Sequence, residues 1–147
     1  MINLNKLLIA FITVAGLVSS FAASAADTDA MECSVAVNFT SGAGSLTYAK
    51  VFEVSPAAPF SDDFSSATRF RFFDATVAIE SGTPVVSIFF DADVSVFNAV
   101  SFEASLKVRD ENKGETTSGN HGFYSSVPGA GGSNRTDYTL SCKRAKN

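Results

Sequence analysis

The sequence predicts an all-β domain, an antiparallel β-sandwich of about seven or eight strands. Three observations lead to this fold class. Apolar residues recur with a period of two between Ala67 and Asp110, Gly and Pro residues separate short segments, and amphipathic helical patterns of useful length do not join these segments. A small closed β-barrel is the alternative architecture for such a series of strands.

The N-terminal residues have the organisation of a signal peptide. Residues 1–26 carry one basic residue, Lys6, followed by an apolar run and then by small residues. This pattern predicts cleavage near Ala25 or Ala26. We therefore expect residues 27–147 to form a single domain that is periplasmic or secreted, with no integral membrane segment after cleavage.

The charge balance is mildly acidic. The chain has 11 Lys and Arg against 15 Asp and Glu, a formal net charge of −4, and loss of Lys6 with the leader makes the remainder one unit more negative. Nucleic-acid binding requires clustered basic residues, so we expect no nucleic-acid partner. Another protein or a component of the cell surface is the kind of partner that we expect.

The two cysteines, Cys33 and Cys142, predict a disulfide between the first and the last strand. An even number of cysteines in an oxidising compartment indicates a bridge, and with two the pairing is forced. Each cysteine shares its strand face with apolar residues, Val35 and Val37 in the first strand and Leu140 in the last. The bond is therefore expected inside the core.

The first third of the chain contains two predicted strands and a loop. The first strand includes Cys33, the Gly-rich segment Thr40–Ser45 is a turn, and Leu46–Val54 is the second strand. The segment Ser55–Ser66 contains two prolines and adjacent aspartates, which predicts a long loop with a short helical turn after Ser61. Two phenylalanines in this loop are expected to pack over the sandwich rather than to face a partner.

The central stretch predicts an antiparallel meander of three strands. Its strands are Thr68–Glu80, Pro84–Phe97 and Val100–Arg109, with turns at Ser81–Pro84 and around Asn98. In the first of these strands, the apolar alternation changes parity between adjacent phenylalanines. That change predicts a β-bulge, or a strand that crosses from one sheet to the other.

The last third of the chain is more polar. Asp110–Asn120 is predicted to be a loop, Phe123–Val127 a short strand, and Pro128–Asn134 a flexible loop. Thr136–Lys143 alternates apolar and polar residues and is the last predicted strand.

The residues that carry catalysis in other proteins are sparse here. The one histidine, His121, lies in a polar segment, and the nucleophile pattern GxSxG does not occur. Both cysteines are expected to form the disulfide, which removes thiol chemistry and zinc binding. The sequence therefore predicts no catalytic residues, no enzyme activity and no cofactor.

Four aspartates are candidate calcium ligands. Asp91 and Asp93 share one strand face, and Asp62 and Asp63 are adjacent in the predicted loop. The EF-hand spacing DxDxDG is missing, and acidic pairs at strand ends commonly discourage edge pairing. We therefore predict no metal site, and calcium-dependent binding stays an alternative that would use these residues.

Phenylalanines placed opposite the main apolar face predict an interaction surface. The residues proposed for this surface are Phe60, Phe64, Phe73, Val85, Phe89 and Phe97. The leading functional hypothesis is a non-enzymatic protein that binds a target or serves as a surface component. One alternative is a carrier that closes its strands into a barrel around a small apolar ligand, and another is an enzyme with a carboxylate site at Asp91 and Asp93.

Overall fold

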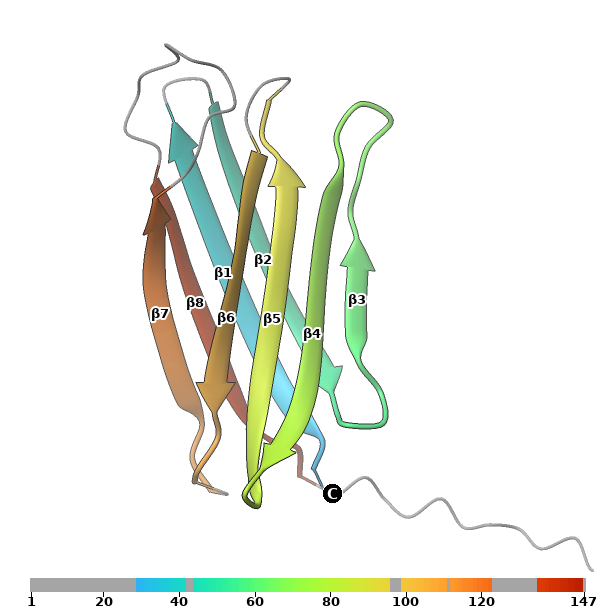
Figure 1. Ribbon diagram of the computed structural model, residues 1–147, viewed down its shortest axis with the longest axis vertical. Helices are drawn as coiled ribbons and strands as arrows, with labels where there is room; N and C mark the ends of the chain where they lie inside the picture. Colours follow the sequence, from blue (N-terminus) through green and yellow to red (C-terminus); the bar gives the residue numbers. More distant parts are fainter. Residues whose placement is uncertain (1–28, 42–43, 96–98, 111, 123–134, 147) are drawn as a thin grey trace, which may run out of the picture.

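The computed structural model describes residues 29–41, 44–95, 99–110, 112–122 and 135–146. The described residues form two four-stranded antiparallel sheets, with strand orders β2-β1-β8-β7 and β3-β4-β5-β6 (Figure 1). The strands are β1 (Met31–Ser41), β2 (Gly44–Val54), β3 (Phe60–Asp63), β4 (Arg71–Glu80), β5 (Thr83–Asp93), β6 (Ala99–Lys107), β7 (Glu115–Gly122) and β8 (Arg135–Arg144).

The two sheets pack face to face as a β-sandwich, which confirms the predicted fold class. Figure 1 shows the β3-β4-β5-β6 sheet lying across the other sheet. The alternative prediction, a closed barrel, is wrong, because no strand of one sheet is hydrogen-bonded to a strand of the other in the described chain. The described residues also include no helix that is long and apolar enough to cross a membrane.

Alternation along the strands separates the core from the surface. In β6 the apolar residues Val100, Phe102 and Leu106 are buried, whereas the residues between them are exposed or half-buried. Successive side chains of a strand point to opposite faces, so a period of two buries one complete face. The same rule places Cys33, Val35, Val37 and Phe39 of β1 in the core.

A chain of aromatic rings runs through the middle of this core and joins the two sheets. Ring centroids lie 5.4 Å apart between Phe52 and Phe73, 5.6 Å between Tyr48 and Phe90, and 5.2 Å between Phe102 and Tyr138. Tilted and offset contacts at these distances stabilise a core beyond simple area burial. Each of these three pairs connects a strand of one sheet to a strand of the other.

The disulfide forms where the sequence predicts it. Cys33 and Cys142 are directly opposed in the β1–β8 register, are bonded to each other and are each 2% exposed. The bond links positions 109 residues apart in the sequence. On the chain-entropy estimate, a closed loop of this length stabilises the folded protein by about 4–5 kcal/mol.

The hairpin between β4 and β5 also follows its prediction. Glu80 pairs with Thr83, so Ser81 and Gly82 form a two-residue loop. Both have positive φ, 50° at Ser81 and 80° at Gly82. Turns of this kind match the twist of the flanking strands, and glycine adopts the second position without steric cost.

Two segments predicted as loops contain strands. Phe60–Asp63 forms β3, which pairs with β4 instead of forming a helical turn, and Glu115–Gly122 forms β7 on the edge beside β8. Both strands are poor in buried apolar residues, because β3 is short and β7 is polar. Hydrogen bonds to a longer neighbouring strand hold both strands in their sheets, although their own apolar pattern does not predict a strand.

The predicted bulge in the first meander strand is wrong. β4 pairs with β5 in continuous register, with Phe72 opposite Asp91 and Phe73 opposite Phe90. The inward series therefore begins at Phe73, and Phe72 points outward. Asn98, Phe97, the predicted strand Phe123–Val127, the loop Pro128–Asn134 and the predicted leader 1–26 lie outside the described residues.

Candidate binding face

The outward side of the β3-β4-β5-β6 sheet, called here the outer face, carries an unusual set of side chains. Phenylalanines and carboxylates alternate on it from strand to strand. In one cross-strand row Asp74, Phe89 and Glu103 lie side by side, and in the next row Phe72 stands opposite Asp91. Each of these two rings therefore has a carboxylate on a neighbouring strand at the close spacing of paired residues.

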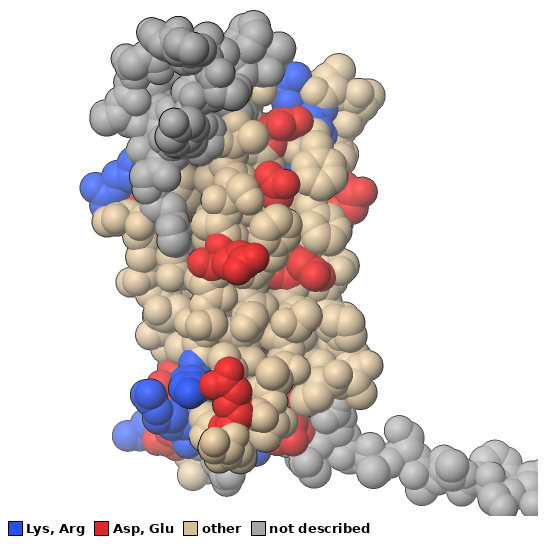
Figure 2. Space-filling model, viewed as in Figure 1, with Lys and Arg blue, Asp and Glu red and all other residues tan. Residues whose placement is uncertain are grey.

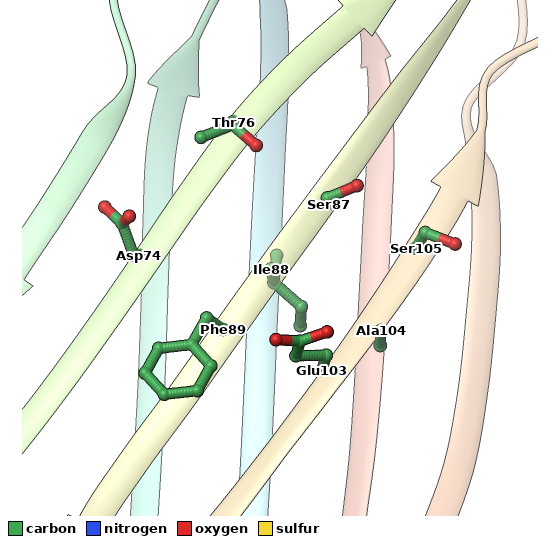
Figure 3. Close-up of a pocket in the computed structure, with 8 residues that line it drawn as sticks. All are labelled: Asp74, Thr76, Ser87, Ile88, Phe89, Glu103, Ala104 and Ser105. Carbon is green, nitrogen blue, oxygen red and sulfur yellow. The ribbon is translucent and has the colours of Figure 1, made fainter.

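A shallow hollow of about 470 Å³ lies on the outer face beside this pattern. Its floor is the row of short side chains Thr76, Ser87 and Ser105, which are directly opposed across the three strands. Figure 3 shows Phe89 with its ring broadside in the view, and Asp74 and Glu103 on either side of it. Small residues next to a large ring and two carboxylates therefore create the depression.

The charge of the outer face is mainly negative, and Lys107 is its basic residue on β3 to β6. Besides Glu80, five carboxylates lie on it, those of Asp63, Asp74, Asp91, Asp93 and Glu103, and none of these five forms an ion pair with a described residue. Figure 2 shows the acidic side chains across the middle and upper part of this face, with basic side chains at its margins. Lys107 and Glu80 form an ion pair at the far end of this face, with 3.0 Å between Nζ and Oε2.

The ionisation of Asp91 is affected by its burial and by a neighbouring carboxylate. Desolvation by burial and the nearby charge of Asp93 raise the pKa of Asp91. Both effects disfavour the ionised carboxylate in the folded protein. Asp91 therefore adds charge to the outer face without stabilising the fold.

Three of the carboxylates are held in place by hydrogen bonds. The backbone N–H of Phe70 donates to Asp93 at 2.9 Å, that of Ser65 donates to Asp63 at 3.0 Å, and the Ser61 hydroxyl donates to Asp74. The hydrogen bonds from the Ser65 side chain and backbone lower the pKa of Asp63. These contacts fix the positions of the carboxylates while leaving oxygen atoms open to a ligand.

Phe70 and Phe72 form an aromatic pair that extends the outer face beyond the start of β4. Phe70 is 52% exposed, and its ring centroid lies 6.4 Å from that of Phe72. An exposed phenylalanine costs the protein hydrophobic stabilisation that burial would supply. Neither residue is among those predicted from the sequence for an interaction surface, although the parity of the buried Phe73 places both outside.

The residues predicted to form an interaction surface lie in different environments, some on the outer face and some in or against the core. Phe89 lies on the outer face, whereas Phe73 is fully buried and its assignment to a surface is wrong. Val85 points outward but is only 6% exposed. Phe60 and Phe64 pack against the core, which confirms the expectation that they cover the sandwich. Phe97 lies outside the described residues.

The aspartates considered for calcium do not form one group. Asp62 points into the sandwich, where it accepts a hydrogen bond from the Tyr48 hydroxyl at 2.8 Å and pairs with Lys50 at 3.0 Å. The Lys50 hydrogen bond is the main reason why the pKa of Asp62 is lowered. Within the described ranges no three His, Cys, Asp or Glu residues are grouped so that they could hold a metal ion.

The outward side of the other sheet differs in both charge and shape. Two of its acidic residues, Glu32 and Asp137, form ion pairs with Lys143 at 2.7 Å and Arg135 at 2.8 Å, and a third, Glu53, is exposed on β2. Small residues dominate the centre of that side, and its exposed apolar residue is Val51. Unpaired charge combined with aromatic rings is therefore a property of the β3-β4-β5-β6 sheet.

Comparison with known proteins gives no relative from which a role could be transferred. No family model matches the chain, and no curated protein matches it in sequence.

Proposed function

We propose that this chain is a non-enzymatic binding protein of the periplasm or the extracellular space, and that the outer face contacts its target. One observation carries the proposal: unpaired carboxylates alternate with phenylalanines on an open sheet. Folding alone does not favour this combination, because rings that are left partly exposed forgo some burial and like charges repel. Surfaces that depart from what stability favours are commonly functional.

The compartment is supported by two features of the chain. The Cys33–Cys142 bond is of a kind that persists in oxidising compartments. Residues 1–26 have the order of charge, apolar run and small residues that is typical of a signal peptide. Both features favour export, with cleavage near Ala25 or Ala26.

The other functional hypotheses have less support. A carrier with a ligand inside a barrel would need an interior space, whereas the sandwich interior is filled by the aromatic rings of the core. An enzyme based on Asp91 and Asp93 would need further polar groups converging on a substrate, and the neighbour of Asp91 across β4 is Phe72. A binding role requires only the surface that is present.

The experiment blocks the hollow and compares the result with a matched change on the other sheet. Ser87→Trp fills the floor of the hollow, and Ser34→Trp places the same side chain on the outward side of β1. Both serines are exposed in central strands. Labelled oxidised protein is applied to cells of the producing organism whose outer envelope has been permeabilised, so that periplasmic and external targets are both accessible, and the retained fraction is measured.

We expect Ser87→Trp to reduce retention about tenfold and Ser34→Trp to leave it unchanged. Urea denaturation of both variants checks that the fold is intact. Retention that survives Ser87→Trp, or that both variants reduce equally, would contradict a role for the outer face.

A further inference from the structure

The outer face has a charge pattern that selects one kind of partner. Five of its carboxylates form no ion pair with a described residue, so a ligand that brings positive charge gains attraction with all of them. A neutral ligand would have to desolvate these groups without compensation. Charge complementarity therefore favours a cationic partner.

The phenylalanines indicate which kind of cation the outer face would bind. Phe89 lies between Asp74 and Glu103, and Phe72 lies beside Asp91 (Figure 3). Arginine and lysine side chains bind over aromatic faces, and arginine also forms two parallel hydrogen bonds with a carboxylate. A ring flanked by carboxylates matches such side chains better than it matches a bare metal ion, which needs several oxygen ligands close together.

The spacing along β5 indicates how the cations are arranged. Phe89, Asp91 and Asp93 follow one another on the outward side at steps of two residues. Two residues of a strand span about 7 Å. Cations at the same interval occur in an extended peptide that has a basic residue at every second position, since alternate side chains share one face.

We propose that the partner of the outer face is an extended segment of another protein with basic residues at alternate positions, running along β5. Its basic side chains stack on Phe89 beside Glu103 and pair with Asp91 and Asp93. The small residues Thr76, Ser87 and Ser105 leave room for the end of the segment in the hollow. This inference rests on the proposed function and adds the chemistry of the target.

The test uses three synthetic decapeptides and the oxidised protein. One peptide alternates Arg and Ser, the second has the same composition with all arginines contiguous, and the third replaces Arg by Gln in the alternating order. Binding is measured by isothermal titration calorimetry at low and at high salt. We expect the alternating peptide to bind most tightly, and to bind at least tenfold more weakly at high salt because exposed charges are screened.

Matched variants locate the binding on the outer face. Glu103→Gln removes a carboxylate beside Phe89, and Glu53→Gln removes one from the exposed side of β2. We expect Glu103→Gln to weaken binding about threefold to tenfold and Glu53→Gln to leave it unchanged. Phe89→Leu keeps an apolar side chain but removes the ring, and should weaken binding about threefold to fivefold.

Several results would overturn the inference. Equal binding of the contiguous or the Gln peptide would exclude the alternating basic segment, and equal effects of Glu103→Gln and Glu53→Gln would show attraction to the whole acidic protein. If no peptide binds while Ser87→Trp still abolishes retention on cells, the outer face is a binding surface for a different ligand. If neither test gives a signal, the proposed function fails as well.

Discussion

The two sides of the β3-β4-β5-β6 sheet use the same residue type for different purposes. Phe73 and Phe90 are fully buried and belong to the aromatic chain that joins the sheets. Phe72 and Phe89, each one position earlier, point outward among carboxylates. Strand alternation alone separates them. The number of phenylalanines therefore says little about stability until each ring is assigned to the inner or the outer side of the sheet.

The largest difference in stability between a substitution inside the core and one on an outward side is expected at the disulfide. Replacing Cys33 and Cys142 together by Ser should lower the free energy of unfolding by about 4–5 kcal/mol, since the unfolded chain regains its loop entropy. Urea denaturation of the variant and of the oxidised parent measures this loss. Ser34→Ala, on the outward side of β1, is the control and should be nearly neutral. A loss below about 1 kcal/mol would show that the native bond is offset by strain.

The adjacent phenylalanines of β5 give the most direct comparison of the two sides. Phe90→Ala leaves a cavity in the core and should cost about 3–5 kcal/mol, whereas Phe89→Ala should cost less than about 1 kcal/mol. Equilibrium denaturation of the two variants under identical conditions measures both values. Equal losses would mean that the outer face is packed against another part of the protein.

A smaller effect is expected at the polar contact inside the sandwich. Tyr48→Phe removes the hydrogen bond to Asp62 and should lower stability by about 1 kcal/mol at neutral pH. Burial, followed by the hydrogen bond and the charge of Asp62, raises the pKa of Tyr48. The folded protein therefore keeps the phenol proton that the unfolded chain releases above about pH 10, so stability falls with pH there.

Tyr48→Phe removes this contribution, so the stability of the variant should fall less steeply above about pH 10 than that of the parent. Denaturation midpoints measured from neutral pH to about pH 11 test the difference. Parallel profiles of parent and variant would contradict the assigned burial of the Tyr48 hydroxyl. The Asp62 carboxylate acts at the acidic end: its lowered pKa stabilises the fold above the unfolded value, and this stabilisation is lost as the pH falls through the folded pKa.

The smallest expected effect has the opposite sign and belongs to the outer face. Asp91→Asn should raise stability at neutral pH by less than about 1 kcal/mol, because the raised pKa shows that the charged form is disfavoured in the fold. The gain should vanish at acidic pH, where Asp91 is protonated in both folded and unfolded chains. Thermal denaturation at neutral and acidic pH measures it. A loss of stability at neutral pH would mean that Asp91 serves the fold.

Particular residues show how far the sequence alone could be interpreted. The period of two in Val100–Arg109 and the parity of both cysteines predicted buried strands and an internal disulfide, and both predictions are confirmed. β3 and β7 were missed because β3 has only four residues and β7 is polar, so neither has an apolar alternation of its own. The outward position of Phe89 was predicted from its parity, but Phe70 and Phe72 were missed because a bulge was predicted where the register is continuous.

The sequence by itself determined which residues could alternate between core and surface, since that depends only on local strand geometry. It also determined the pairing of the cysteines, because only two are present. The tertiary structure decided that the strands form two open sheets and which neighbours meet across them. Asp74, Phe89 and Glu103 lie on three successive strands, and only the register of β4, β5 and β6 makes them one row. That register depends on the length and type of the connections between the strands, which the apolar alternation within each strand does not specify.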